Sequence, residues 1–254
     1  MIYSGLVTAT FRDLDAEQIV KLCKEAGIES IEWSSDVHVK KGDIEHATYV
    51  KNLCDEHNIA VASYATYYTL GQNEDVEKEF DLYAQVAKVL GTKFLRVWAG
   101  KVDTKIISKE KRDALIDEAN VIATLAKEQG LILSYEYHHE TLTETLESTE
   151  YLLNNTHNTM THWQRPYGST FELNIMQIKT LKDDIKNFHV NNAHSRGNYQ
   201  LLEEIIDEWV SYLKLVKDEE RDIYACLEFA KDKSIISFLK DAKALKEILV
   251  KVYE

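Results

Sequence analysis

The amino-acid sequence predicts a single (β/α)8 barrel domain that spans residues 1–254. Three observations favour this fold. Short apolar runs alternate with longer amphipathic stretches eight times along the chain. The repeat takes about 32 residues, which suits a barrel of roughly 250 residues. No linker rich in proline, glycine or serine divides the chain, and its one proline is Pro166.

The expected strands are short and mostly apolar, as parallel strands covered on both faces should be. We expect them at residues 2–8, 28–33, 59–65, 93–99, 131–137, 159–163, 185–190 and 223–229. An open, doubly wound sheet is the alternative. It is disfavoured because the turn after the first strand reads TATFRDLD and carries no GxGxxG phosphate-binding motif.

The helices between these strands have recognisable ends. The first is expected to open with a capping box formed by Asp15 and Gln18 and to end before Gly27. Gly91 and Gly130 follow two later helices in the same way. A glycine in the left-handed conformation commonly ends a helix, so each of these positions predicts a turn into the next strand.

Charge and cysteine content narrow the functional class. The chain carries 30 basic and 43 acidic residues, a net charge of -13, which opposes binding to nucleic acid or to an anionic membrane. Its three cysteines form no CxxC pair, so a disulfide framework and a zinc finger are not expected. No apolar run reaches the length of a membrane span, and the amino terminus does not resemble a signal peptide. We therefore expect a cytoplasmic protein.

Polar residues gather where four of the expected strands end, which is where barrel enzymes place their active sites. By the two-residue period of a strand, Glu136 shares a face with His138, His162 with Gln164, and His189 with Asn191. Glu228 ends the eighth strand. A carboxylate inside an apolar strand is costly unless it is paired, so Glu136 and Glu228 together with His189 predict one divalent metal ion. Oxygen and imidazole ligands favour Mn, Mg or Co over a structural zinc.

The sequence also resembles the sugar phosphate isomerase/epimerase superfamily, the xylose isomerase-like TIM barrels. The resemblance lies in the opening VTATFRDLDAEQIVKLCKEAGIESIEWSSDVHV and in LRVWAG of the fourth strand. It implies metal ligands after strands five to eight, which match Glu136, His189 and Glu228 in SYEYHH, NFHVNN and CLEFA. Gln164 in THWQRP takes the place of the family's sixth-strand aspartate. The resemblance implies that Gln164 binds the ion through its neutral amide oxygen, so the site carries one negative charge fewer.

The resemblance implies an isomerase or epimerase that moves a proton through an enediolate on a sugar, a sugar phosphate or a related hydroxy-ketone. Glu136 and Glu228 would transfer the proton and His138 would assist. The segment ETLTETLESTEYLL resembles the 3-dehydroshikimate dehydratase branch, in which a histidine matching His138 is catalytic, but Asn191 replaces that branch's lysine. A dehydratase and a metal-free, metabolite-binding barrel therefore stay open, whereas a nuclease of the endonuclease IV type is disfavoured by the net charge.

Further residues near the strand ends are expected to contact a small, carbohydrate-like substrate, and the chain is a candidate homodimer. For the aromatic residues among them, ordinary packing is an equally good interpretation. The expected contacts are Trp33, His38, Tyr64, Arg96, Trp98, Arg165, Asn191 and Arg196.

Overall fold

The computed structural model describes residues 1–218 and 220–254, and within them eight parallel strands close into a barrel. Around the barrel the strands follow the order β1-β10-β7-β6-β5-β4-β3-β2. Their bounds are β1 (Ile2–Val7), β2 (Ser30–Ser34), β3 (Ala60–Thr69), β4 (Phe94–Trp98), β5 (Ile132–Glu136), β6 (Thr159–Gln164), β7 (Ile185–Val190) and β10 (Ile223–Leu227). The predicted barrel fold is confirmed.

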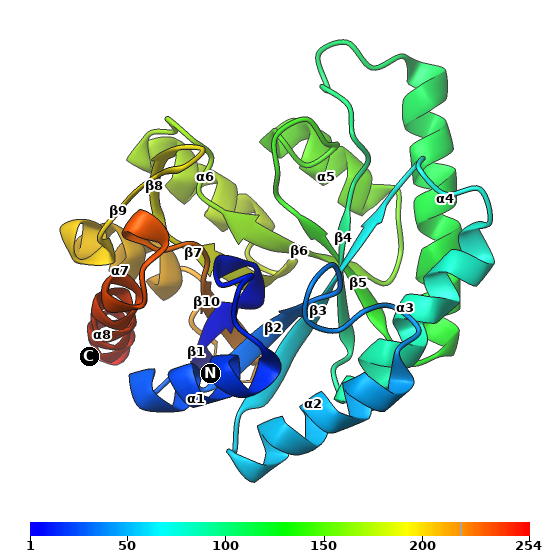
Figure 1. The fold of residues 1–254 in the computed structure, drawn as a ribbon. Coiled ribbons are helices and arrows are strands. Elements are labelled where there is room, and N and C mark those ends of the chain that lie inside the picture. Colours follow the sequence, from blue (N-terminus) through cyan, green and yellow to red (C-terminus); the bar gives the residue numbers. More distant parts are fainter. Residues whose placement is uncertain (219) are drawn as a thin grey trace.

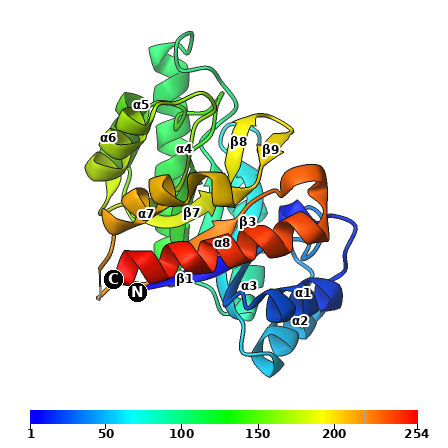
Figure 2. The ribbon, with the colours of Figure 1, turned by 90° about the vertical axis from the view of Figure 1, so that its left-hand side faces the viewer.

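Helices connect the strands and lie around the outside of the barrel (Figure 1). They are α1 (Ala16–Ala26), α2 (Ile44–Glu56), α3 (Val76–Leu90), α4 (Lys109–Glu128), α5 (Leu146–Asn154), α6 (Phe171–Leu181), α7 (Ile206–Lys214) and α8 (Ile235–Tyr253). The last helix runs alongside β1 (Figure 2), where the Ile2 amide donates to the Tyr253 hydroxyl at 2.8 Å. Of the helices within the described residues, none is long and apolar enough to cross a membrane.

The predicted helix ends are confirmed. Asp15 and Gln18 form both hydrogen bonds of a capping box at the start of α1. Gly27 and Gly91 adopt the left-handed conformation directly after α1 and α3, and Gly130 has a positive φ of 73° just past α4. A side chain is strained in this conformation, so glycine suits these turns from helix to strand.

The main difference from the predicted fold is a small antiparallel hairpin formed by β8 (Asn192–Ser195) and β9 (Asn198–Gln200). It follows β7, on the side of the barrel where the strands end (Figure 2). Strand β3 is also longer than expected and runs on to Thr69. Both differences lie among the loops that follow strand ends, where hydrophobic periodicity is weak and tertiary contacts set the conformation.

Side chains of the barrel strands face either the surrounding helices or the barrel interior. Outward-facing side chains such as Ile31 and Trp33 pack into the large apolar layer between strands and helices. Inside the barrel, Val7, Ala62 and Cys226 belong to a separate, small apolar cluster. Polar side chains on the inner faces of the strands lie above this cluster, and they form the candidate site.

Candidate active site

Three side chains from the ends of three strands meet inside the barrel. Glu136 is the last residue of β5, His189 lies one residue before the end of β7, and Glu228 directly follows β10. The His189 Nδ1 atom lies 3.3 Å from Glu228 Oε2 and 3.6 Å from Glu136 Oε1. The three residues are buried, and each offers one ligand atom within 4.8 Å of the others. We call them the upper cluster; they are three of the four residues that the sequence predicted as metal ligands, and Gln164 is the fourth.

Glu136 is surrounded by hydrogen-bond donors. Arg96 donates to Oε2 through its guanidinium, and Trp98 Nε1 donates to the same oxygen at 2.6 Å. Gln164 Nε2 donates to Oε1 at 3.3 Å. Hydrogen bonds to the charged form of a carboxylate lower its basicity, so this arrangement favours Glu136 as an ionised ligand rather than as a base.

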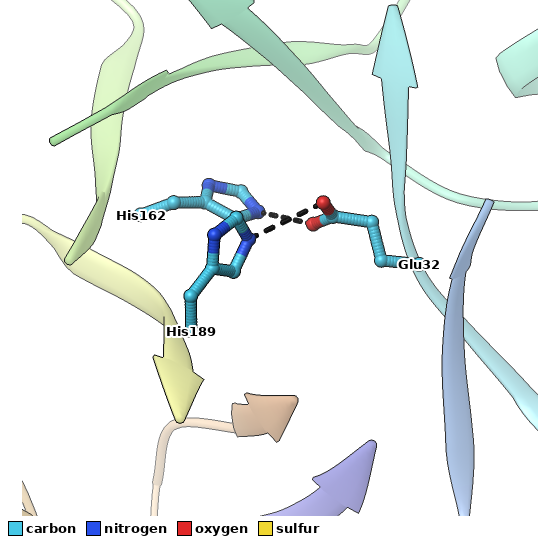
Figure 3. A group of neighbouring side chains, drawn as sticks. All are labelled: Glu32, His162 and His189. Carbon is cyan, nitrogen blue, oxygen red and sulfur yellow. Dashed lines mark ion pairs between the residues drawn. The ribbon is translucent and has the colours of Figure 1, made fainter. Parts of the chain in front are cut away.

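Beneath the upper cluster lies a second carboxylate, Glu32 of β2, which is fully buried. Its Oε1 atom lies 2.9 Å from Arg96 Nε and 3.3 Å from His189 Nε2, and its Oε2 atom lies 3.0 Å from His162 Nε2. Figure 3 shows the carboxylate of Glu32 facing both imidazoles. Glu32, His162 and His189, which we call the lower cluster, also offer three ligand atoms within 4.8 Å of one another.

The sequence interpretation missed Glu32, although the signal was present. Glu32 stands between Ile31 and Trp33 in an apolar strand, so the argument that selected Glu136 and Glu228 applies to it equally. The period-two rule then places Glu32 inside the barrel and Trp33 outside.

The charges of this buried site do not balance among the side chains alone. Three carboxylates (Glu32, Glu136 and Glu228) face one guanidinium, that of Arg96. Burial opposes ionisation of Glu32, but Arg96, His189 and His162 outweigh it and hold the pKa of Glu32 well below its usual value. When both imidazoles are neutral, as a metal-ligating His189 must be, the site carries two uncompensated negative charges.

The excess of negative charge raises the pKa of His189. Burial disfavours the charged imidazolium, yet Glu228 and Glu32 outweigh that effect and raise the pKa of His189 to about 9. By contrast, burial lowers the pKa of His162 to about 4. Both ring nitrogens of His189 are buried and lack a hydrogen-bond partner within the described residues. A proton on His189 offsets one of the two surplus charges, and a divalent cation held by the upper cluster would replace that proton and offset both charges.

A cavity of about 560 Å³ opens above the upper cluster, and Glu136 and Glu228 line it. Its walls combine basic residues, aromatic rings and two further carboxylates, those of Glu140 and Glu144. The basic residues that line it are Arg12, Arg96, Lys101, Arg165 and Arg196, and the aromatic ones are Tyr67, Trp98, Tyr137, Tyr167, Tyr199 and Phe229. This volume suits a small molecule.

His138 lines the same cavity and is held in one orientation. Its ring stacks on Trp98, with centroids 4.8 Å apart and planes 23° apart. Its Nδ1 atom lies 2.7 Å from the carbonyl oxygen of His139 and therefore donates to it. That hydrogen bond leaves Nε2 without the proton, and burial lowers the pKa of His138, so Nε2 of His138 can accept a proton.

Gln164 was predicted to face the metal ion with its amide oxygen, but in the structure its amide nitrogen faces the site. Its amide nitrogen donates to the carbonyl oxygen of Tyr137 at 2.9 Å, as well as to Glu136. An NH2 group is a donor and cannot bind a cation. Ligation through the amide oxygen would require the side chain to turn over and to lose the hydrogen bond to Tyr137.

Of the expected substrate contacts, Arg96, Trp98, Arg165 and Arg196 line the cavity. Arg165 is already engaged: its guanidinium donates to Asn192 Oδ1 at 3.2 Å and to the carbonyl oxygen of Ala193 at 3.1 Å, both in β8. It therefore ties the hairpin to the end of β6. Arg196 lies in the turn of that hairpin.

The other four expected contacts lie outside the cavity lining. Trp33 packs in the outer apolar layer, and the Tyr64 hydroxyl donates to the Val39 carbonyl oxygen at 2.6 Å. His38 Nε2 lies 3.2 and 3.1 Å from the carbonyl oxygens of Phe11 and Leu14 and ties that loop in place. Asn191 Oδ1 accepts from the backbone amide of Ala193 at 3.2 Å. Hydrogen bonds within the protein hold Tyr64, His38 and Asn191, and packing holds Trp33.

Two of the residues that line the cavity, Tyr67 and Phe229, have unusual backbone conformations. Tyr67, at the end of β3, has φ 55°, and Phe229, directly after Glu228, has φ 60°. Bulky residues rarely adopt positive φ, and such strain often accompanies function. Here it turns both rings into the cavity, where Phe229 packs on Tyr199 of the hairpin with centroids 5.1 Å apart.

Comparison with known proteins agrees with the barrel fold. The family model described as xylose isomerase-like TIM barrel matches residues 20–249. The chain belongs to this family. Members and structural neighbours of this xylose isomerase-like barrel include a dehydratase and epimerases. The predicted family is thereby confirmed.

One curated relative is the 3-dehydroshikimate dehydratase of Bacillus anthracis, 26% identical over 160 residues. That match covers 60% of this chain and 57% of the relative's length. Among solved structures, the probable 3-DHS dehydratase AsbF from the same organism has a TM-score of 0.80 at 21% identity, covering 97% of this chain and 99% of that one. The IolI protein with a bound zinc atom has a TM-score of 0.76 at 16% identity, covering 98% and 97%. An L-ribulose 3-epimerase has a TM-score of 0.72 at 13% identity, covering 100% and 95%. At these identities the structures establish the shared fold.

Proposed function

We propose that this protein is a divalent-metal-dependent enzyme that removes a proton next to the carbonyl group of a small, hydroxylated substrate. The observation that carries the proposal is the pair of uncompensated negative charges at the floor of a substrate-sized cavity. Glu136, His189 and Glu228 would hold the ion. When bound, the ion supplies a Lewis acid that polarises the substrate's carbonyl group.

Dehydration is the outcome that we favour. His138 has a free Nε2 lone pair, and Glu136 is held by Arg96, Trp98 and Gln164, so His138 is the better base. His138 takes the proton from the carbon beside the carbonyl. It then returns that proton to the hydroxyl group that leaves from the next carbon, and the products are water and an unsaturated ketone. The dehydratases among the relatives support this choice.

Isomerisation or epimerisation of a sugar, a sugar phosphate or a related hydroxy-ketone is the second candidate. Glu136 and Glu228 come from β5 and β10, which β6 and β7 separate in the barrel wall. Two carboxylates on different sides of a substrate are the arrangement that proton exchange on both faces requires. The epimerases among the structural neighbours support this alternative.

The first experiment measures bound metal per chain after supply with Mn, Mg, Co or Zn. We expect about one ion in the unaltered chain and its loss in Glu228→Gln, because that change removes one of the two surplus charges. Glu118→Gln is the matched control: Glu118 accepts from the Tyr68 hydroxyl at 2.7 Å and from the Gly71 amide at 2.8 Å, away from the cluster. An absence of bound metal under every supply would refute the proposal and favour a metal-free, metabolite-binding barrel.

The second experiment separates the two reactions. The loaded enzyme is incubated in deuterated water with 3-dehydroshikimate and, separately, with a panel of ketoses and ketose phosphates. Loss of water from the substrate identifies a dehydratase, and deuterium incorporation without loss of water identifies an isomerase or epimerase. His138→Gln should retain the metal and lower kcat by about 10²–10⁴-fold if His138 is the base. A kcat within twofold of the unaltered enzyme would exclude that role.

A further inference from the structure

The lower cluster has the composition of a metal site, yet its surroundings point to another role. Glu32 and His162 are fully buried and do not line the cavity. The other contacts of Glu32 are already made: the Ser63 hydroxyl donates to Oε2, His162 Nε2 lies 3.0 Å from Oε2, and Arg96 Nε lies 2.9 Å from Oε1. The guanidinium therefore provides the positive charge at this position, and repulsion between like charges disfavours a second cation beside it.

The contacts of His189 divide between the two clusters. Its Nδ1 atom faces Glu136 and Glu228, and its Nε2 atom lies 3.3 Å from Glu32 Oε1. Both Nε2 and Oε1 are buried; Oε1 also faces Arg96 Nε at 2.9 Å, whereas Nε2 has no hydrogen-bond partner within the described residues. They are thus a matched donor and acceptor, provided that the proton of the neutral imidazole is on Nε2.

We propose that Glu32 is a positioning residue that fixes His189 in its Nε2–H form, so that Nδ1 is the nitrogen offered to the metal ion. This inference rests on the proposed metal-dependent function. A histidine ligand generally donates its second N–H to a carboxylate or carbonyl group, which sets the orientation of the ring. Arg96 extends the effect, because its guanidinium contacts both Glu32 and Glu136. One buried ion pair thereby orients two of the three expected ligands.

The test measures the protonation state of His189 directly. Nitrogen NMR of the 15N-histidine-labelled, zinc-loaded chain should show a proton on Nε2 of His189 and none on Nδ1. A proton on Nδ1 would overturn the inference, whatever the variants show. This measurement uses the unaltered chain, so it remains decisive if substitution of Glu32 prevents folding.

The second measurement is the dissociation constant for Co²⁺ or Zn²⁺. We expect Glu32→Gln to weaken binding by about 10–100-fold, and the control Glu118→Gln to stay within twofold of the unaltered chain. Unchanged affinity in Glu32→Gln would overturn the role of Glu32 and leave the proposed function intact. An unaltered chain that binds no divalent ion would instead refute both proposals.

Discussion

Replacement of Arg96 by methionine should destabilise the fold severely. Arg96 is 3% exposed, and its guanidinium contacts the carboxylates of both Glu32 and Glu136. Methionine fills much of the same volume but carries no charge. The change therefore leaves two buried carboxylates without their common cation, and both must become protonated or take in water.

The size of the effect follows from this burial. Removal of one partner of a buried ion pair costs about 3–5 kcal/mol, and the melting temperature of a domain of this size should fall by about 6–20 °C. Arg12→Met is the matched control. Arg12 pairs with Asp36, but its side chain is 46% exposed, so its loss should cost about 1 kcal/mol or less.

The assay is urea unfolding of both variants and of the unaltered chain, after treatment with a chelator. The free energy of unfolding of Arg96→Met should fall well below that of Arg12→Met. Addition of a divalent ion should then recover part of the loss in Arg96→Met, because the ion supplies positive charge beside Glu136. Equal stability of the two variants, within about 1 kcal/mol, would show that Arg96 does not neutralise the buried carboxylates.

Two further changes test the interior away from the cavity. Burial, together with other smaller effects, raises the pKa of Asp241 from 3.8 to about 6, so its contribution to stability falls as the pH rises from about 4 to 6 and stays low above that range. In Asp241→Asn, the new side chain can still accept from the Leu202 amide. Thermal unfolding should show this variant to be about 2 kcal/mol more stable than the unaltered chain at pH 7.5 and equally stable at pH 4. A gain in stability at pH 4 would contradict the reasoning. Gly5→Ala would place a methyl group against Cys226 Sγ and 2.7 Å from Ser30 Oγ inside the barrel, so urea unfolding should show a loss of about 1–3 kcal/mol. Cys226→Ala in the same chain should recover part of that loss, and failure to do so would place the strain elsewhere.

The barrel could be predicted because its determinants are local. The alternation of apolar runs, the capping box at Asp15 and the glycines after the helices each depend on neighbouring residues. The same holds for Glu136 and Glu228. A carboxylate in an apolar strand signals a buried charge wherever the strand lies, and all the strands of a parallel barrel end on the same side.

The substrate contacts were predicted less well because they depend on the direction in which each side chain points. Trp33 and Tyr64 have the right side chains at the right strand ends, but their rings face the helices or bond to the backbone. Tyr67 and Phe229 reach the cavity through positive φ angles, which no hydrophobic pattern encodes. The β8–β9 hairpin, which carries Arg196 in its turn, likewise depends on tertiary contacts, because Arg165 donates hydrogen bonds to its first strand.

The sequence by itself therefore determined the fold family, the side of the barrel that holds the site, and the upper cluster of Glu136, His189 and Glu228. Only the tertiary structure decided how the charges of that site are shared. Glu32 and Arg96 are 64 positions apart in the chain, and each also contacts a residue from another strand. Closure of the barrel brings these groups within a few ångströms of one another, and at such distances in a buried interior each group sets the ionisation of the next.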